Sequence, residues 1–126
     1  MKVIDTNLLL RLATNDDPVQ CQQAAALLQS CLLNEVFICN AVLVEFFFIL
    51  ESKQHPYKLS RKEVVATLAG MLKLPQLYVN DKTESAIQLA ASQPKLDFTD
   101  CLLAVYADMS ANGVLTFDKD LLKFLR

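Results

Sequence analysis

Apolar residues occur along this chain in two kinds of block, short unbroken runs and longer segments with helical spacing. The short runs predict buried strands at residues 2–4, 36–39, 77–79 and 114–116. The longer segments predict helices at residues 7–13, 18–33, 40–52, 60–72, 81–92, 97–111 and 118–125. Strands that are apolar throughout and separated by helices are typical of a parallel sheet covered on both faces. The pattern therefore predicts an α/β fold with a central parallel sheet of about four short strands.

Polar residues at the predicted helix ends support these boundaries. Residues 15–18, NDDP, place acids at a cap and proline in the first turn of a helix, and residues 60–63, SRKE, have the capping-box pattern. Asn40, Asp81 and Asp97 are expected to cap three further helices. The helix at 97–111 is expected to end at Asn112-Gly113, with the glycine in a left-handed conformation.

Composition narrows the class of protein. The 126 residues suit a single domain spanning 1–126, and 53% of them are apolar, with a mean hydropathy of +0.29, which favours burial against a partner. The formal net charge is −2, so there is no broad basic surface for passive binding to nucleic acid. No apolar run approaches the roughly 18 residues of a membrane span. No signal peptide or zinc-spaced cysteine pair is present, and we expect a cytoplasmic protein with four reduced cysteines.

Four aspartates lie where predicted strands end or predicted helices begin. Asp5 and Asp118 follow the first and last strands, and Asp97 and Asp100 lie in the first turn of a helix. Ligands of parallel α/β sheets bind beyond the carboxyl ends of the strands, so these positions share the functional edge. Glu45 differs, because it is a lone carboxylate in a strongly apolar helix and must face either solvent or a polar site.

Each of these acids, taken alone, could be an ordinary cap or strand end. Converging carboxylates raise one another's pKa unless a cation lies between them. An all-oxygen site selects Mg²⁺ or Mn²⁺ over zinc, and these ions suit the hydrolysis of phosphodiesters. The only histidine is His55, which excludes cleavage of RNA by a histidine pair, and the chain has no glycine-rich phosphate loop or nucleophile elbow.

Four sequence motifs resemble those of PIN domains and come in the same order. Residues 3–7, VIDTN, resemble the opening motif, and residues 43–45, LVE, resemble the second acidic position. Residues 96–104, LDFTDCLLA, resemble the Asp-Phe-x-Asp-Ala-Leu-x-Ala motif, with Cys101 where alanine is common. Residues 116–120, TFDKD, resemble the closing Thr-x-Asp motif, and together the motifs cover almost the whole chain.

The resemblance implies a PIN-like three-layer α/β/α sandwich and a metal-dependent endoribonuclease. The size of the chain is most similar to that of the VapC-type toxins of toxin–antitoxin pairs. Those toxins are usually homodimers, and a cognate antitoxin inserts into the catalytic cleft. The expected partners are therefore an RNA substrate, a second copy of the chain and an antitoxin protein, with no membrane.

The resemblance also assigns roles to residues. The expected ligands of Mg²⁺ or Mn²⁺ are Asp5, Glu45, Asp100 and Asp118. Asp97 competes with Asp100 for one role, and Asp100 is favoured because Asp97 is at the cap position. Asp97 stays open as a further ligand. Asn7 and Thr116 are expected to hydrogen-bond to the carboxylates or to the substrate phosphate, although Thr116 could be only a strand residue.

The roles of two further groups of residues stay open. Five cations could meet RNA phosphates, although for most of them a solvated position is the simpler expectation: Arg11, Lys53, Arg61, Lys62 and Lys119. Residues 46–48, three consecutive phenylalanines, cover more than one helix face and could form a dimer seam or lie inside the monomer.

Three alternative functions remain. A housekeeping RNA-processing nuclease would have the same site but no antitoxin. A catalytically silent PIN-like binding module would be expected to lack an acid, and none is missing. An aspartyl phosphatase would want Asp-x-Asp near the first strand, where this chain has Asp5-Thr6-Asn7.

Overall fold

Three short parallel strands form the only sheet, and all of them lie in the first part of the chain. The strands are β1 (Lys2–Val3), β2 (Val36–Phe37) and β3 (Leu77–Tyr78), in the order β1-β2-β3. Val36 pairs with Lys2 on one side and with Leu77 on the other. Strand β1 is therefore an edge strand, and it leads directly into the candidate site at Asp5.

The structure is a computed structural model that describes all residues, 1–126, and its internal contacts define two units. The N-terminal unit is Met1–Val79 and the C-terminal unit is Asn80–Arg126. The prediction of a single domain stays a prediction. None of the helices is both long enough and apolar enough to cross a lipid bilayer.

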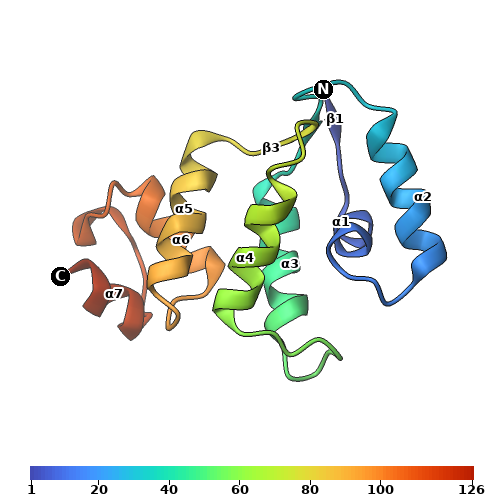
Figure 1. The fold of residues 1–126 in the computed structure, drawn as a ribbon. Coiled ribbons are helices and arrows are strands. Elements are labelled where there is room, and N and C mark those ends of the chain that lie inside the picture. The colour runs from blue at the N-terminus through green and yellow to red at the C-terminus, as the bar shows by residue number, and fades with distance from the viewer. The chain divides into compact units, whose positions relative to one another are not determined.

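Four helices surround the sheet of the N-terminal unit. They are α1 (Thr6–Ala13), α2 (Pro18–Gln29), α3 (Asn40–Glu51) and α4 (Arg61–Met71). Helix α1 packs against α2, α3 and α4, while α2 lies on one side of β1 and α3 and α4 lie on the other (Figure 1). Fully buried side chains fill the unit, among them Leu9, Ile38, Leu43, Phe46 and Leu50. The predicted fold class, helices on both sides of a short parallel sheet, is confirmed.

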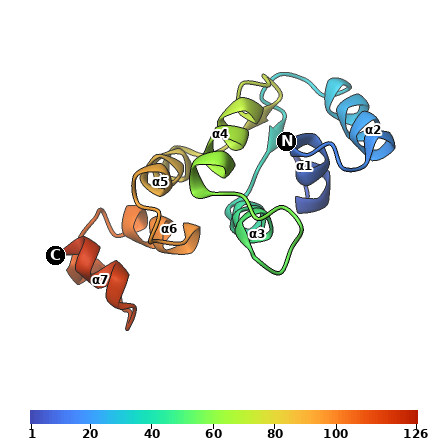
Figure 2. The same ribbon diagram turned by 60° about the horizontal axis from the view of Figure 1, so that its bottom comes forward.

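The C-terminal unit is entirely helical. It consists of α5 (Asp81–Ser92), α6 (Phe98–Tyr106), the 3-10 turn η1 (Ala111–Gly113) and α7 (Lys119–Leu125). Helices α5 and α6 lie side by side (Figure 2), and small buried residues on both of them, Ala86, Ala90, Cys101 and Ala104, allow close packing. This packing fixes the first turn of α6, where two of the candidate acids lie.

The fourth predicted strand, residues 114–116, is not formed. Val114 is extended and buried, but Leu115 is fully exposed, at 101% of its reference area, and no strand pairs with the segment. The prediction was wrong because a short apolar run does not supply the hydrogen-bonding neighbour that a strand requires.

The helix predicted at 97–111 ends early. It stops at Tyr106, and the left-handed residues after it are Asp108 (φ 51°) and Met109 (φ 61°), whereas no glycine in the chain has a positive φ. The N–H of Met109 donates to the carbonyl of Ala104 at 2.8 Å, which closes the helix end in the manner usually built on glycine. The expected role of Gly113 was therefore wrong, since aspartate also tolerates the left-handed region.

Two predicted caps move by one residue, and three, at Asp17, Ser60 and Asp97, are confirmed. Cys39 occupies the cap position before α3, so Asn40 is already helical, and Asn80 rather than Asp81 caps α5. Asp17 caps α2 with proline following, and Ser60 forms the predicted capping box with Glu63. Helix α2 also ends sooner than predicted, at Gln29.

Candidate active site

Three of the candidate acids are N-caps of helices. Asp5 caps α1, Asp97 caps α6 and Asp118 caps α7, and all three are exposed. In each case one carboxylate oxygen accepts the backbone N–H three residues later, at 2.9 Å from Leu8, 2.8 Å from Asp100 and 2.9 Å from Leu121. The second oxygens of Asp5 and Asp118 accept no hydrogen bond, whereas the carboxylate of Asp97 also interacts with the side chain of Asp100. Capping therefore orients these side chains and leaves an oxygen on Asp5 and on Asp118 that could bind a cation.

Asp100 has a different environment from the caps. It lies in the first turn of α6 and is half-buried, because the neighbouring Phe98 and Cys101 direct this helix into the core of its unit. Burial, and then the negative charges of Asp97 and Asp118, raise the pKa of Asp100 from 3.8 to about 6. The arrangement places unfavourable negative charge at the N-terminal end of α6, which a divalent cation would relieve.

Glu45 lies on the exposed side of α3. The buried residues of this helix, Leu43, Phe46, Phe47 and Leu50, follow helical spacing, and Glu45 falls outside their stripe. Of the two expectations for this residue, solvent or a polar site, the structure gives exposure to solvent. The carboxylate is therefore accessible to a ligand without any cost of burying its charge.

Asn7 and Thr116, the two residues expected to hydrogen-bond to the acids or to the substrate phosphate, have different contacts. Thr116 accepts a hydrogen bond from the backbone N–H of Asp118 through Oγ1 at 2.9 Å. It therefore orients Asp118 through its main chain rather than through its carboxylate. Asn7 is exposed and lines the same cleft as Asp5, and it shares no hydrogen bond with that carboxylate.

The candidate ligands are divided between the two units. Asp5 and Glu45 belong to the N-terminal unit, whereas Asp97, Asp100 and Asp118 belong to the C-terminal unit. Neither unit by itself gathers three or more acidic, histidine or cysteine side chains in a group that could hold a metal ion. None of the five acids takes part in an ion pair. Their oxygen chemistry fits a hard divalent cation, and a shared site for them stays a prediction.

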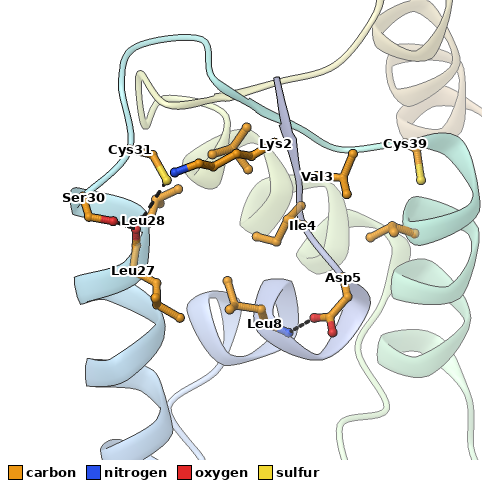
Figure 3. A pocket seen from close by; sticks show the side chains of 12 residues that line it. Lys2, Val3, Ile4, Asp5, Leu8, Leu27, Leu28, Ser30, Cys31 and Cys39 are labelled. Carbon is orange, nitrogen blue, oxygen red and sulfur yellow. Dashed lines mark hydrogen bonds between the residues drawn. The ribbon is translucent and has the colours of Figure 1, made fainter.

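An apolar groove of about 630 Å³ runs along β1 in the N-terminal unit. Figure 3 shows Val3 of the strand, Ile4 and Asp5 directly after it, and Leu27 and Leu28 of α2 around the groove. Lys2 and Asp5 are the only charged residues in its lining, and Lys2 is paired with Glu35 at 3.2 Å. The groove is thus an apolar surface that includes a candidate metal ligand.

A second, smaller cleft between α1 and α2 also includes Asp5. Its volume is about 250 Å³, and polar side chains line it: Asn7 and Arg11 from α1, and Gln20 and Gln23 from α2. None of the four sequence motifs joins these four side chains into one group. The spacing of Asn7 and Arg11, four residues apart on one helix, was the signal that could have found it.

The other candidate cations have different surroundings. The Nε of Arg61 donates to Glu51 at 2.9 Å, and the guanidinium lies 5.7 Å from the centre of the Phe47 ring. Its side chain is only 9% exposed, which indicates a structural role. The remaining three, Lys53, Lys62 and Lys119, are exposed, as expected for solvated charges.

Comparison with known proteins gives one match. The family model described as PIN domain matches residues 2–125, which is nearly the whole chain. Neither the comparison with curated proteins nor the comparison with solved structures found a match.

Proposed function

Since the chain belongs to the PIN domain family, whose members are generally nucleases that use divalent metal ions, we propose that it is a metal-dependent endoribonuclease. The proposed ligands of Mg²⁺ or Mn²⁺ are Asp5, Glu45, Asp100 and Asp118. They are the acids of the four motifs, two from each unit. Asp97 is assigned the helix cap.

One observation gives this proposal its strongest support. The burial of Asp100 and the charges of Asp97 and Asp118 raise its pKa to about 6, and no lysine or arginine pairs with any of the three. A fold that placed these charges within one another's influence only as caps and surface charges would gain nothing from this repulsion. A divalent cation supplies the missing positive charge.

The chain's own residues have distinct tasks in this proposal. Asp5, Glu45, Asp100 and Asp118 would hold the Mg²⁺ or Mn²⁺, which would supply an activated water and stabilisation of the leaving oxygen of the phosphodiester. Asp5 and Asp118 are held at helix starts by their cap hydrogen bonds, so each presents its free oxygen in a fixed direction. The hydroxyl of Thr116 fixes the main chain at Asp118. Pre-positioned ligands of this kind lower the entropic cost of assembling the site.

The test is cleavage of end-labelled single-stranded RNA by the purified protein with Mg²⁺, with Mn²⁺ and with EDTA. We expect internal cuts with either metal and none with EDTA. Thermal unfolding in the same three buffers gives a readout that does not depend on activity, because a ligand that binds only the folded state raises the melting temperature. RNA cleavage that persists in EDTA would contradict the metal requirement. The absence of both cleavage and a melting shift would favour the silent binding module.

We further propose that the nuclease is the toxin of a toxin–antitoxin pair. The apolar groove along β1 supports this, because a partner segment lying in it would contact Asp5. The exposed apolar residues Val3, Leu27 and Leu32, at 70%, 58% and 71%, give a partner further surface in the same unit. Expression of the chain should arrest growth, and co-expression of a small neighbouring reading frame should restore it. Cleavage without toxicity would favour a housekeeping nuclease.

We also propose a homodimer. Phe48 is 60% exposed, whereas Phe46 and Phe47 beside it are buried, so one phenylalanine of the three is available to a second copy. Light scattering at micromolar concentration should give twice the 14.1 kDa mass of the chain. A Phe48→Ser variant that stays folded should shift toward monomer, and a wild-type protein that is monomeric throughout the range would refute the proposal.

A further inference from the structure

The cleft between α1 and α2 is polar on two sides and lies wholly within the N-terminal unit. Asn7 and Arg11 come from one helix and Gln20 and Gln23 from the other, so guanidinium and amide groups line a space of about 250 Å³. Ala24 and Leu27 add an apolar wall. A space of this size, with N–H donors set in a partly apolar lining, suits a phosphate and part of a ribose.

Arg11 is the one cation of this cleft, and it is held in place by three side chains. Its Nη1 donates to Oδ1 of Asp16 at 3.3 Å, and its Nε donates to the side-chain oxygen of Gln20. The guanidinium also hydrogen-bonds to the side chain of Tyr57, and because arginine has five N–H donors, these three partners do not use all of them. The half-buried guanidinium is thus oriented by the protein and keeps donors free for a ligand.

Asp16 is itself anchored from a distant segment. The hydroxyl of Tyr57, 41 residues away, donates to Oδ2 of Asp16 at 2.6 Å, and Oγ1 of Thr14 donates to Oδ1 at 2.8 Å. These hydrogen bonds, with Tyr57 the largest cause, lower the pKa of Asp16 and keep it ionised. Tyr57 and Asp16 are therefore positioning residues for Arg11.

The negative charge of Asp16 does not prevent Arg11 from binding an anion. The side chains of Arg11 and Asp16 are 30% and 43% exposed, and an ion pair so open to solvent is weak. Arginine also offers a planar fork of donors that can bind a second oxyanion beside the first. An arginine anchored in this way, with N–H donors to spare, is accordingly a preorganised donor for phosphate.

The position of the cleft relates it to the proposed nuclease site. Asp5 lines the same cleft, and Arg11 follows it by six residues, or about 9 Å along the axis of α1. That separation is larger than a single phosphate spans. A phosphate bound at Arg11 is therefore a neighbour of the phosphate being cut.

We propose that the α1–α2 cleft is a binding subsite for an RNA backbone phosphate adjacent to the cleaved one, with Arg11 as its main donor and Gln23 and Asn7 as secondary donors. This inference rests on the proposed function, because RNA is taken as the ligand. The subsite reads no base, so it contributes affinity and register rather than sequence preference.

The test is the salt dependence of RNA binding. Fluorescence anisotropy with a labelled single-stranded RNA in EDTA measures binding without cleavage, from 50 to 300 mM KCl. Arg11→Gln should weaken binding roughly 5- to 10-fold at the lowest salt and reduce the slope of log K against log salt by about 0.7. Arg11→Lys should keep the slope and recover part of the affinity. With metal present, Arg11→Gln should raise KM far more than it lowers kcat.

Two further variants separate a phosphate contact from a structural effect. Lys73 is exposed and has no ion pair, so Lys73→Gln should leave the slope nearly unchanged. Asp16→Asn deletes a negative charge but keeps a side-chain oxygen that can accept from Arg11, so it should bind RNA at least as tightly as the wild type. Equal losses in Asp16→Asn and Arg11→Gln would overturn the proposal, because both would then report a disturbed α1–α2 contact.

The outcomes distinguish this subsite from the nuclease itself. Wild-type protein that binds and cleaves RNA, together with an unchanged Arg11→Gln variant, overturns the subsite and leaves the nuclease standing. Arginine-dependent binding without any cleavage supports the subsite while the proposed activity fails. A wild type that does not bind RNA overturns both.

Discussion

Helices α3 and α6 are both strongly apolar and each carries one acid of the proposed site, but the two acids have different surroundings. Glu45 lies on the exposed side of α3, outside the buried stripe. Asp100 lies half-buried in the first turn of α6, beside Asp97 and within the field of Asp118. The apolar character of a helix therefore does not decide how a carboxylate on it behaves. The behaviour of the carboxylate is decided by its position relative to the buried face of the helix and by its charged neighbours.

The largest effect expected from this comparison is a loss of RNA cleavage in the Asp100→Asn variant. Asparagine keeps the size of the side chain but removes the charge that would hold the metal. We expect cleavage of RNA in Mg²⁺ to fall at least about 100-fold, a loss of about 3 kcal/mol of transition-state stabilisation. Initial rates with labelled RNA measure this. Activity equal to that of the wild type would remove Asp100 from the site.

Glu45→Gln should give a smaller loss, about 10- to 100-fold. The carboxylate is exposed, so water can replace it as a ligand more easily than it can replace a half-buried one. The same initial-rate assay applies, and raising the Mn²⁺ concentration should restore part of the activity. A loss larger than that of Asp100→Asn would reverse the order that the comparison predicts.

The two variants should differ most clearly in stability without metal. The pKa of Asp100 is raised from 3.8 to about 6 in the folded state, so its stabilising contribution is complete below pH 4 and is lost between about pH 4 and 6. At pH 7 the ionised group destabilises the fold, and Asp100→Asn should be more stable in EDTA by about 1 kcal/mol after solvent screening.

The measurement is thermal unfolding in EDTA at pH 4, 5, 6 and 7. The gain of Asp100→Asn over the wild type should be greatest at pH 7 and disappear near pH 4. Glu45→Gln serves as the matched control and should show no such gain, because Glu45 is exposed. A gain of the same size in both variants would show that burial is not the cause.

The smallest effect is expected for Asp97→Asn. Asparagine caps helices about as well as aspartate, so α6 should keep its start, and activity should change by no more than a few-fold, or roughly 0.5 kcal/mol. Circular dichroism checks the helix and the cleavage assay checks the site. A loss as large as that of Asp100→Asn would mean that Asp97 is a ligand.

Local features of the fold could be predicted from the sequence, and non-local ones could not. The caps at Asp17, Ser60, Asp97 and Asp118 were visible because a cap requires only a hydrogen bond three residues along the chain. The strand at 114–116 was predicted wrongly, since pairing depends on a neighbour that the local pattern does not contain.

The same distinction holds for the candidate site. The four motifs identified the acids, and helix periodicity left open whether Glu45 faced solvent. The raised pKa of Asp100 comes first from burial, then from Asp97, and then from Asp118, which is 18 residues away, so it could not be read from the motif alone. Arg11 was one of five candidate cations. Only the packing of α1 against α2 distinguishes it from the exposed lysines.

The double use of aspartate as cap and proposed ligand has a genetic consequence. A single G-to-A transition in either aspartate codon produces asparagine, which preserves the cap of α1 at position 5 or of α7 at position 118. One base change can therefore yield a protein that accumulates normally and does not cut RNA. In cultures selected for escape from the nuclease, such transitions at these two codons should be recovered alongside nonsense and frameshift alleles, and immunoblots should separate the two kinds of escape by whether the protein persists.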